Sequence, residues 1–76
     1  MKTDDLRKQI DSIITHILFD YNGKPCGIDP INLNSIDMWY GDDDYCAKSV
    51  DDAMSYPLFD GKSLNQICDK ITNIEI

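Results

Sequence analysis

The strongest constraint on the fold is an alternation of side chains from Ser35 to Tyr40. The positions that would face a core hold Ile36, Met38 and Tyr40. Asp37 and Trp39 fall between them and would lie on the opposite face, as expected for a strand with one buried side. A polar connection, 41–44, follows, and residues 45–48 would return. The segment therefore predicts an antiparallel hairpin.

The register of this hairpin follows from the length of its loop. With a four-residue loop at 41–44, Tyr40 would lie opposite Tyr45, and Asp37 opposite Lys48. The second pair places opposite charges across the strands, which is a favourable arrangement. The apolar face and the charged face of the predicted hairpin thus support the same register.

The N-terminal segment predicts a helix over Thr3–Leu18. Its apolar residues recur at helical spacing on one stripe: Leu6, Ile10, Ile13, Ile14, Ile17 and Leu18. Thr3 is a suitable N-cap, and Asp4 and Asp5 suit the positive end of the helix dipole. Phe19 would point away from this stripe.

Asn22-Gly23 has two interpretations. Gly23 is able to take the left-handed conformation that ends a helix. Alternatively, the dipeptide forms a tight turn between strands at 17–21 and 24–28. Pro25 cannot donate to a ladder and weighs against the hairpin. We therefore expect the helix, followed by a short edge strand at 24–28.

The C-terminal third predicts two helices. Ser49 is an N-cap followed by acidic residues, and Pro57 ends a short helix that buries Ala53 and Met54. Ser63 and Gln66 fit a capping box that opens a second helix. Its buried stripe would hold Leu64, Ile67, Cys68, Ile71 and Ile74. Gly61-Lys62-Ser63 resembles the end of a phosphate-binding loop but lacks its first glycine, so we interpret it as a turn.

Together these segments predict one small α+β domain spanning residues 1–76. The expected order is α-β-β-β-α-α: an N-terminal helix, an antiparallel meander of two to three strands, and two C-terminal helices. A chain of 76 residues has room for one core. The helices would cover one face of the sheet and leave the other bare.

Charge and cysteine content exclude several classes of function. The formal net charge is −7, and thirteen of the fourteen acidic residues are Asp. This charge argues against direct binding of nucleic acid and of anionic membrane surfaces. Three widely spaced cysteines do not form a disulfide framework. We expect reduced cysteines, no membrane span, no secretory leader and a cytoplasmic location.

The most unusual segment, 37–45, combines the single tryptophan with two tyrosines and four carboxylates. Aromatic residues beside acidic ones suit a protein partner that has a basic patch, because Trp and Tyr are enriched at binding hot spots. The predicted partner-binding residues are Phe19, Trp39, Tyr40, Asp42, Asp43, Asp44 and Tyr45. A second copy of the chain is the alternative partner.

Two other classes of function are weaker. A nucleic-acid-mimicking inhibitor of phage or mobile-element type would present carboxylates to a DNA-binding protein, and it requires them in a row along one face. An enzyme or a metal-binding protein is the other class, and the sequence contains no motif for either. Asp42–Asp44 do not match a calcium-binding loop, and His16 lies far in sequence from each cysteine with which it could bind zinc. We therefore expect a non-catalytic interaction module without a cofactor or a metal.

Overall fold

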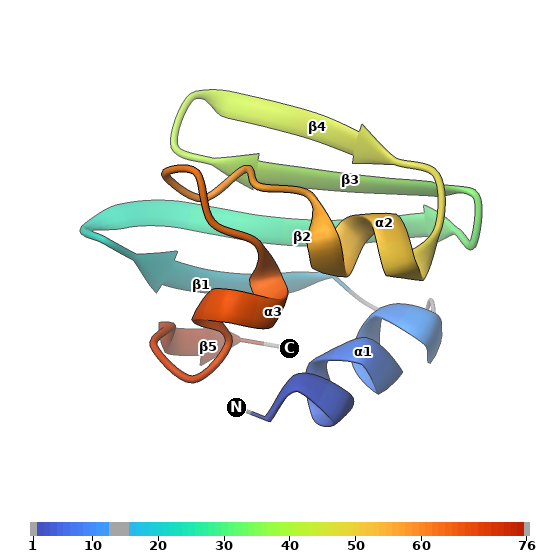
Figure 1. Cartoon of the computed structure of the whole chain (residues 1–76), viewed down its shortest axis with the longest axis horizontal. Helices are drawn as coiled ribbons and strands as arrows, with labels where there is room; N and C mark the ends of the chain where they lie inside the picture. The colour runs from blue at the N-terminus through green and yellow to red at the C-terminus, as the bar shows by residue number, and fades with distance from the viewer. Residues whose placement is uncertain (1, 13–15, 76) are drawn as a thin grey trace.

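The structure, a computed structural model, describes residues 2–12 and 16–75. Three helices lie on one side of a five-stranded sheet (Figure 1). In chain order the elements are α1 (Thr3–Ser12), β1 (Ile17–Tyr21), β2 (Lys24–Asn32), β3 (Ser35–Tyr40), β4 (Asp43–Ala47), α2 (Val50–Ser55), α3 (Leu64–Ile67) and β5 (Thr72–Glu75).

All neighbouring strands are antiparallel, in the order β4-β3-β2-β1-β5. The first four strands form a continuous meander, and the C-terminal β5 returns to pair with β1. The fold is therefore helix, four strands, two short helices and a strand. The predicted meander of two to three strands, in the order α-β-β-β-α-α, is wrong because it lacks two strands, β1 and β5.

The predicted N-terminal helix ends early. α1 stops at Ser12, and the stripe residues Ile17 and Leu18 belong to β1. Ile13 and Ile14, on which the helical spacing also depended, lie outside the described residues. The alternative hairpin interpretation is confirmed: Asn22 and Gly23 have φ angles of 55° and 75°, as a two-residue turn with two left-handed positions requires.

Pro25 is compatible with this hairpin because of its place in β2. It lies opposite Asp20 on β1, and its carbonyl accepts a hydrogen bond from the Gly41 N–H at 2.9 Å. In an antiparallel ladder the N–H and C=O of one residue point to the same side. The missing N–H of Pro25 therefore faces Gly41, where β3 has already ended, and no bond is lost from the middle of the sheet.

The β3–β4 hairpin forms with a shorter loop than predicted. Gly41 and Asp42 make a two-residue turn with a φ of 60° at Gly41, and Tyr40 lies opposite Asp43. The predicted register is wrong by two residues, so Asp37 faces Cys46 rather than Lys48. A shift of two preserves the side of the sheet on which each residue lies, because strand side chains alternate with period two.

The C-terminal helices begin as predicted but the second is short. The Ser49 hydroxyl accepts from the Asp52 N–H at 2.9 Å, and the Ser63 N–H donates to the Gln66 side-chain carbonyl at 2.9 Å. α3 ends at Ile67, and the predicted continuation to Ile74 is wrong. The open edge of β1 takes up this segment as β5 instead.

The core lies between the helices and one face of the sheet. The strands supply Ile17, Phe19, Cys26, Ile28, Ile36, Met38, Tyr40 and Ala47. The helices and the connection between α2 and α3 supply Leu6, Ile10, Ala53, Met54, Phe59, Leu64 and Ile67. Each fully buried large side chain contributes about 1.5–3 kcal/mol of transfer free energy. Among the residues that the structure describes, no helix is both long and apolar enough to cross a membrane.

Candidate functional site

The face of the sheet opposite the helices is the candidate site, and we call it the open face. Its side chains alternate with those that enter the core. They include Leu18, Asp20, Pro25, Gly27, Asp29, Asp37, Trp39, Asp44, Cys46 and Glu75. No described helix covers this face (Figure 1).

Every strand contributes one carboxylate to the open face. In sheet order these are Asp44, Asp37, Asp29, Asp20 and Glu75. The five strands together contain no Arg and a single Lys, Lys24. The Lys24 ammonium lies 4.8 Å from the centre of the buried Tyr40 ring, on the helical side of the sheet. The open face is therefore anionic.

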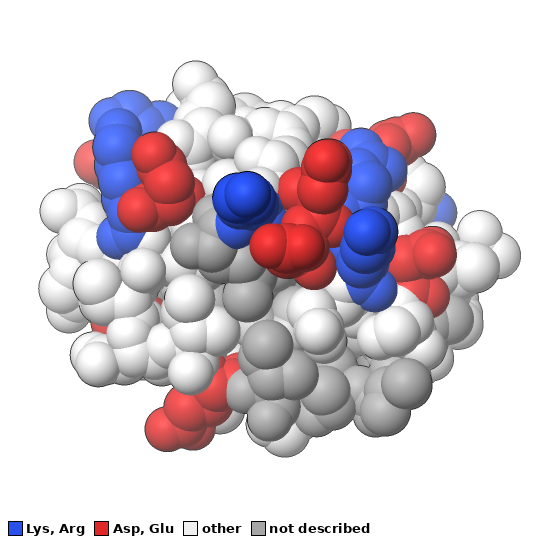
Figure 2. Space-filling view, turned by 90° about the horizontal axis from the view of Figure 1, so that it is seen from below, with Lys and Arg blue, Asp and Glu red and all other residues white. Residues whose placement is uncertain are grey.

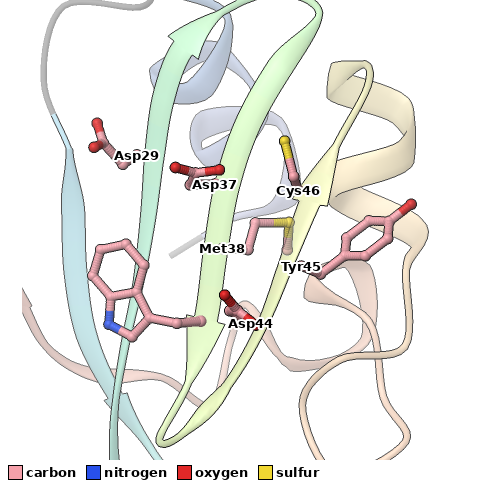
Figure 3. A pocket seen from close by; sticks show the side chains of 7 residues that line it. Asp29, Asp37, Met38, Asp44, Tyr45 and Cys46 are labelled. Atoms are coloured by element: carbon pink, nitrogen blue, oxygen red, sulfur yellow. The ribbon is translucent and has the colours of Figure 1, made fainter.

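Two of these carboxylates lie directly opposite each other. Asp29 on β2 is the cross-strand partner of Asp37 on β3, and Figure 3 shows both projecting from the same side of their strands. Like charges in this arrangement destabilise a sheet by about 0.2–1 kcal/mol. The ion pair found among the described residues lies elsewhere: it joins Arg7 of α1 to Asp51 of α2 at 2.6 Å. Among the described residues, no Lys or Arg forms an ion pair with Asp29 or Asp37.

Trp39 occupies the middle of the open face. It is the cross-strand partner of Gly27, and a Cβ built on Gly27 would lie 2.0 Å from the indole ring. The ring therefore lies directly over the Gly27 backbone and fills the space that a side chain would take. Trp39 remains half-buried, so part of its indole is accessible.

The indole separates two shallow grooves. The first has a volume of about 290 Å³, and Asp29, Asp37 and Asp44 from three adjacent strands line it beside Cys46 (Figure 3). The second, of about 250 Å³, is lined by Leu18, Asp20, Pro25, Asn73 and Glu75. Trp39 borders both grooves. An aromatic surface flanked by carboxylates on two sides suits a Lys or Arg side chain, which combines cation–π contact with ion pairing.

The structure brings together only some of the predicted partner-binding residues. Trp39 and Asp44 are cross-strand neighbours on the open face. Asp42 and Asp43 lie at the β3–β4 turn, beside Lys24 and Pro25. Phe19 and Tyr40 are buried in the core, so their side chains have no access to a partner.

Tyr45 also lies on the helical side of the sheet, where it holds α2. Its hydroxyl donates to an Asp52 carboxylate oxygen at 2.7 Å, and its ring stacks on Tyr56 with centroids 3.5 Å apart. The hydrogen bond to Asp52, more than burial, raises the pKa of Tyr45 to about 12. Contacts with Asp52 and Tyr56 of the same chain therefore hold the Tyr45 side chain in place.

Sequence reasoning missed three of the five carboxylates of the open face, Asp20, Asp29 and Glu75, and it left Asp37 out of the predicted partner-binding residues. The alternation in Ser35–Tyr40 did place Asp37 beside Trp39. Asp29 was assigned to a loop, and Asp20 and Glu75 were assigned to segments next to or inside helices. Recognising the strands on either side of Asn22-Gly23 would have placed Asp20 and Asp29 on the side opposite Phe19 and Ile28.

The other reactive groups do not form a metal-binding cluster in the described part of the chain. Residues 2–12 and 16–75 contain no group of three His, Cys, Asp or Glu side chains arranged to hold a metal ion. Cys26, Cys46 and Cys68 are free thiols, and burial raises the pKa of the Cys26 thiol to about 11. Cys46 alone of the three is exposed.

Comparison with models of known protein families, with curated proteins and with solved structures found no match for this chain.

Proposed function

We propose that this chain is a non-catalytic protein-interaction module that binds a basic segment of a protein partner on the open face of its sheet. The observation that carries the proposal is the pair Asp29 and Asp37, which lie opposite each other and form no ion pair with a Lys or Arg in the described part of the chain. A partner's Lys or Arg would remove that repulsion and form new ion pairs. Both the relief of repulsion and the new ion pairs would therefore increase the affinity for the partner.

Trp39 gives the same face a contact that does not depend on charge alone. Its indole lies over Gly27 and is partly accessible between the two grooves. Trp and the Arg of a partner are both enriched at binding hot spots, and a guanidinium stacks on an indole. A partner with Arg at the centre of its basic patch fits best.

The distribution of charge over the molecule favours this face. Around α1, Lys and Arg side chains lie beside Asp and Glu side chains, so each partly neutralises the other (Figure 2). The open face has a carboxylate from each of the five strands, and none of the described strand residues places a Lys or Arg on it. A basic partner would be steered toward it, with an association rate that falls as salt is added.

The free thiols support a reducing location such as the cytoplasm.

The alternative of a nucleic-acid mimic draws less support from this arrangement. Five carboxylates do lie in a row along the open face, as this alternative requires, but the other nine acidic residues lie elsewhere. Asp43 is on the helical side of β4, and the remaining eight are on helices and turns. Trp39 at the centre has no counterpart in a row of phosphates. Self-association through the open face is also disfavoured, because each copy has a net charge of −7 and the two faces would oppose like charges.

The experiment is titration with an octa-arginine peptide, followed by Trp39 fluorescence and by backbone amide shifts in NMR. We expect the largest shifts at Trp39, Asp37 and Asp44, and weaker binding as salt is raised. The double variant Asp37→Asn/Asp44→Asn should weaken binding about fivefold.

A matched control removes the same charge elsewhere. Asp4 and Asp5 are exposed on α1, so Asp4→Asn/Asp5→Asn changes the net charge equally without touching the open face. We expect less than about a twofold effect from this variant. If both double variants weakened peptide binding equally, the affinity would depend on net charge alone, and the proposed site would be refuted.

A further inference from the structure

The outer edge of β4 presents backbone groups that no described strand pairs. β4 is the last strand in the sheet order and pairs with β3 alone, and Figure 1 shows no element beyond it. The Gly41 N–H bonds to Pro25, so the alternate residues 37, 39 and 41 direct their backbone groups toward β2. On β4, Asp43, Tyr45 and Ala47 then bond to β3. Asp44 and Cys46 direct their N–H and C=O groups outward.

The opposite edge of the sheet is less suited to accept another strand. The pairing of β5 with β1 shifts between Leu18 and Asp20. Asn73 in β5 has a φ of 53°, and its side-chain amide donates to an Asp20 carboxylate oxygen at 2.7 Å. A backbone with such an irregularity does not offer a regular ladder. The β4 edge is therefore the one open for pairing.

The side chains along β4 define what an added strand would need. Asp44 and Cys46 lie on the open face, and Asp44 is beside Trp39. On the helical side, Tyr45 stacks with Tyr56 at this edge. The residue of an added strand opposite Asp44 would meet its carboxylate. A long basic side chain opposite Cys46 would pass over the thiol toward Asp37, the cross-strand partner of Cys46. The residue between these two would meet the two tyrosine rings. The matching pattern is basic–apolar–basic.

We propose that the basic partner binds by strand addition, with an extended basic–apolar–basic segment pairing along β4 as a sixth strand. This inference rests on the proposed function and specifies how the partner is held. Backbone hydrogen bonds at Asp44 and Cys46 supply the pairing, and the carboxylates select the basic residues. A second copy of the chain does not fit, because two β4 edges side by side would join two acidic faces into one.

The test compares two fluorescent eight-residue peptides of identical composition: alternating Lys and Val, and four Lys followed by four Val. Both have the same charge, but only the first has the required alternation. Strand addition predicts about tenfold tighter binding of the alternating peptide in fluorescence anisotropy. Cys46→Pro removes the outward N–H and should abolish this preference, whereas Cys46→Ser should keep it.

The Cys46→Pro change is expected to fold, because proline is tolerated where the N–H of an edge strand faces solvent. If circular dichroism shows that it does not fold, amide hydrogen exchange in the unmodified chain replaces it. Slower exchange at Asp44 and Cys46 with the alternating peptide supports strand addition, and unchanged exchange overturns it.

The remaining outcomes separate this inference from the proposed function. Equal affinity for both peptides, with shifts confined to the open face, overturns strand addition and leaves the proposed function standing. No binding of either peptide or of octa-arginine overturns both. A dimer in sedimentation that Cys46→Pro dissociates would make a second copy the occupant and would also overturn the inference.

Discussion

Trp39 on β3 and Gly27 on β2 are directly opposite each other, and the indole takes the place of the side chain that Gly27 lacks. A glycine in the interior of a strand normally weakens it, because its backbone loses more entropy and no side chain packs there. Here the ring of the neighbouring strand covers the glycine. The position of Trp39 at the centre of the open face thus depends on the absence of a Cβ at residue 27.

Gly27→Ala tests this relationship. The new Cβ would lie 2.0 Å from the indole, so the ring must move. We expect a loss of about 1–3 kcal/mol in the free energy of unfolding, the usual cost of overpacking, together with a red shift of tryptophan emission. Urea denaturation followed by circular dichroism measures the first, and fluorescence measures the second. In a Trp39→Ala background the same substitution should cost much less; an equal cost would show that the ring is not the cause.

The start of α2 provides a prediction about local stability. The Ser49 hydroxyl accepts from the Asp52 N–H at 2.9 Å, whereas the Ser55 hydroxyl donates to the Asp51 carbonyl in the same helix. Ser49→Ala should lower the free energy of unfolding by about 1 kcal/mol because an N-cap is lost. Ser55→Ala should have little effect, since the backbone acceptor stays bonded in the helix. Thermal unfolding of both variants checks the difference, and equal losses would contradict it.

The strand pattern around residues 35–47 was predictable because one face is buried and the other is not. The two sides of β3 and β4 were assigned correctly, although the register was wrong by two residues. The error came from loop length. Gly41 at a φ of 60° allows a two-residue turn, which brings Asp43 into β4, and an acidic run alone does not distinguish a loop from an exposed strand end.

β1 and β5 were not predictable from local pattern. Ile17 and Leu18 continue a helical spacing begun at Leu6, and only the turn at Asn22-Gly23 makes them part of a strand. β5 forms because β1 has an open edge, which is a property of the assembled sheet. The open face could therefore be predicted only in part: Trp39, Asp37 and Asp44 follow from one hairpin, whereas Asp20 and Glu75 require the complete sheet.

Thiol reactivity provides a check on the two sides of the sheet. Cys46 is exposed on the open face, whereas Cys26 and Cys68 are buried, and burial raises the pKa of Cys26 to about 11. At pH 8 iodoacetamide should modify one thiol rapidly in the folded chain and three in denaturant, as counted by mass spectrometry. Cys46→Ser should remove the rapid reaction. Rapid modification of a second thiol under native conditions would contradict the burial of Cys26 and Cys68.

The contact between Tyr45 and Asp52 predicts how stability depends on alkaline pH. The hydrogen bond to the carboxylate raises the pKa of Tyr45 from its ordinary value of about 10 to about 12 in the folded chain. Between these values the folded chain keeps a proton that the unfolded chain has released. The stabilisation from this contact is therefore complete below pH 10 and declines as the pH rises toward 12.

Asp52→Asn should return the Tyr45 pKa toward 10, because an amide does not oppose the phenolate charge as a carboxylate does. Asp51→Asn, one position away and paired with Arg7, is the matched control and should leave the Tyr45 pKa near 12. Carbon-13 NMR of the tyrosine ring carbons follows this titration residue by residue. In urea denaturation, Tyr45→Phe should lose less stability than the unmodified chain between pH 10 and 12. A parallel decline in both proteins would show that Tyr45 does not control the alkaline transition.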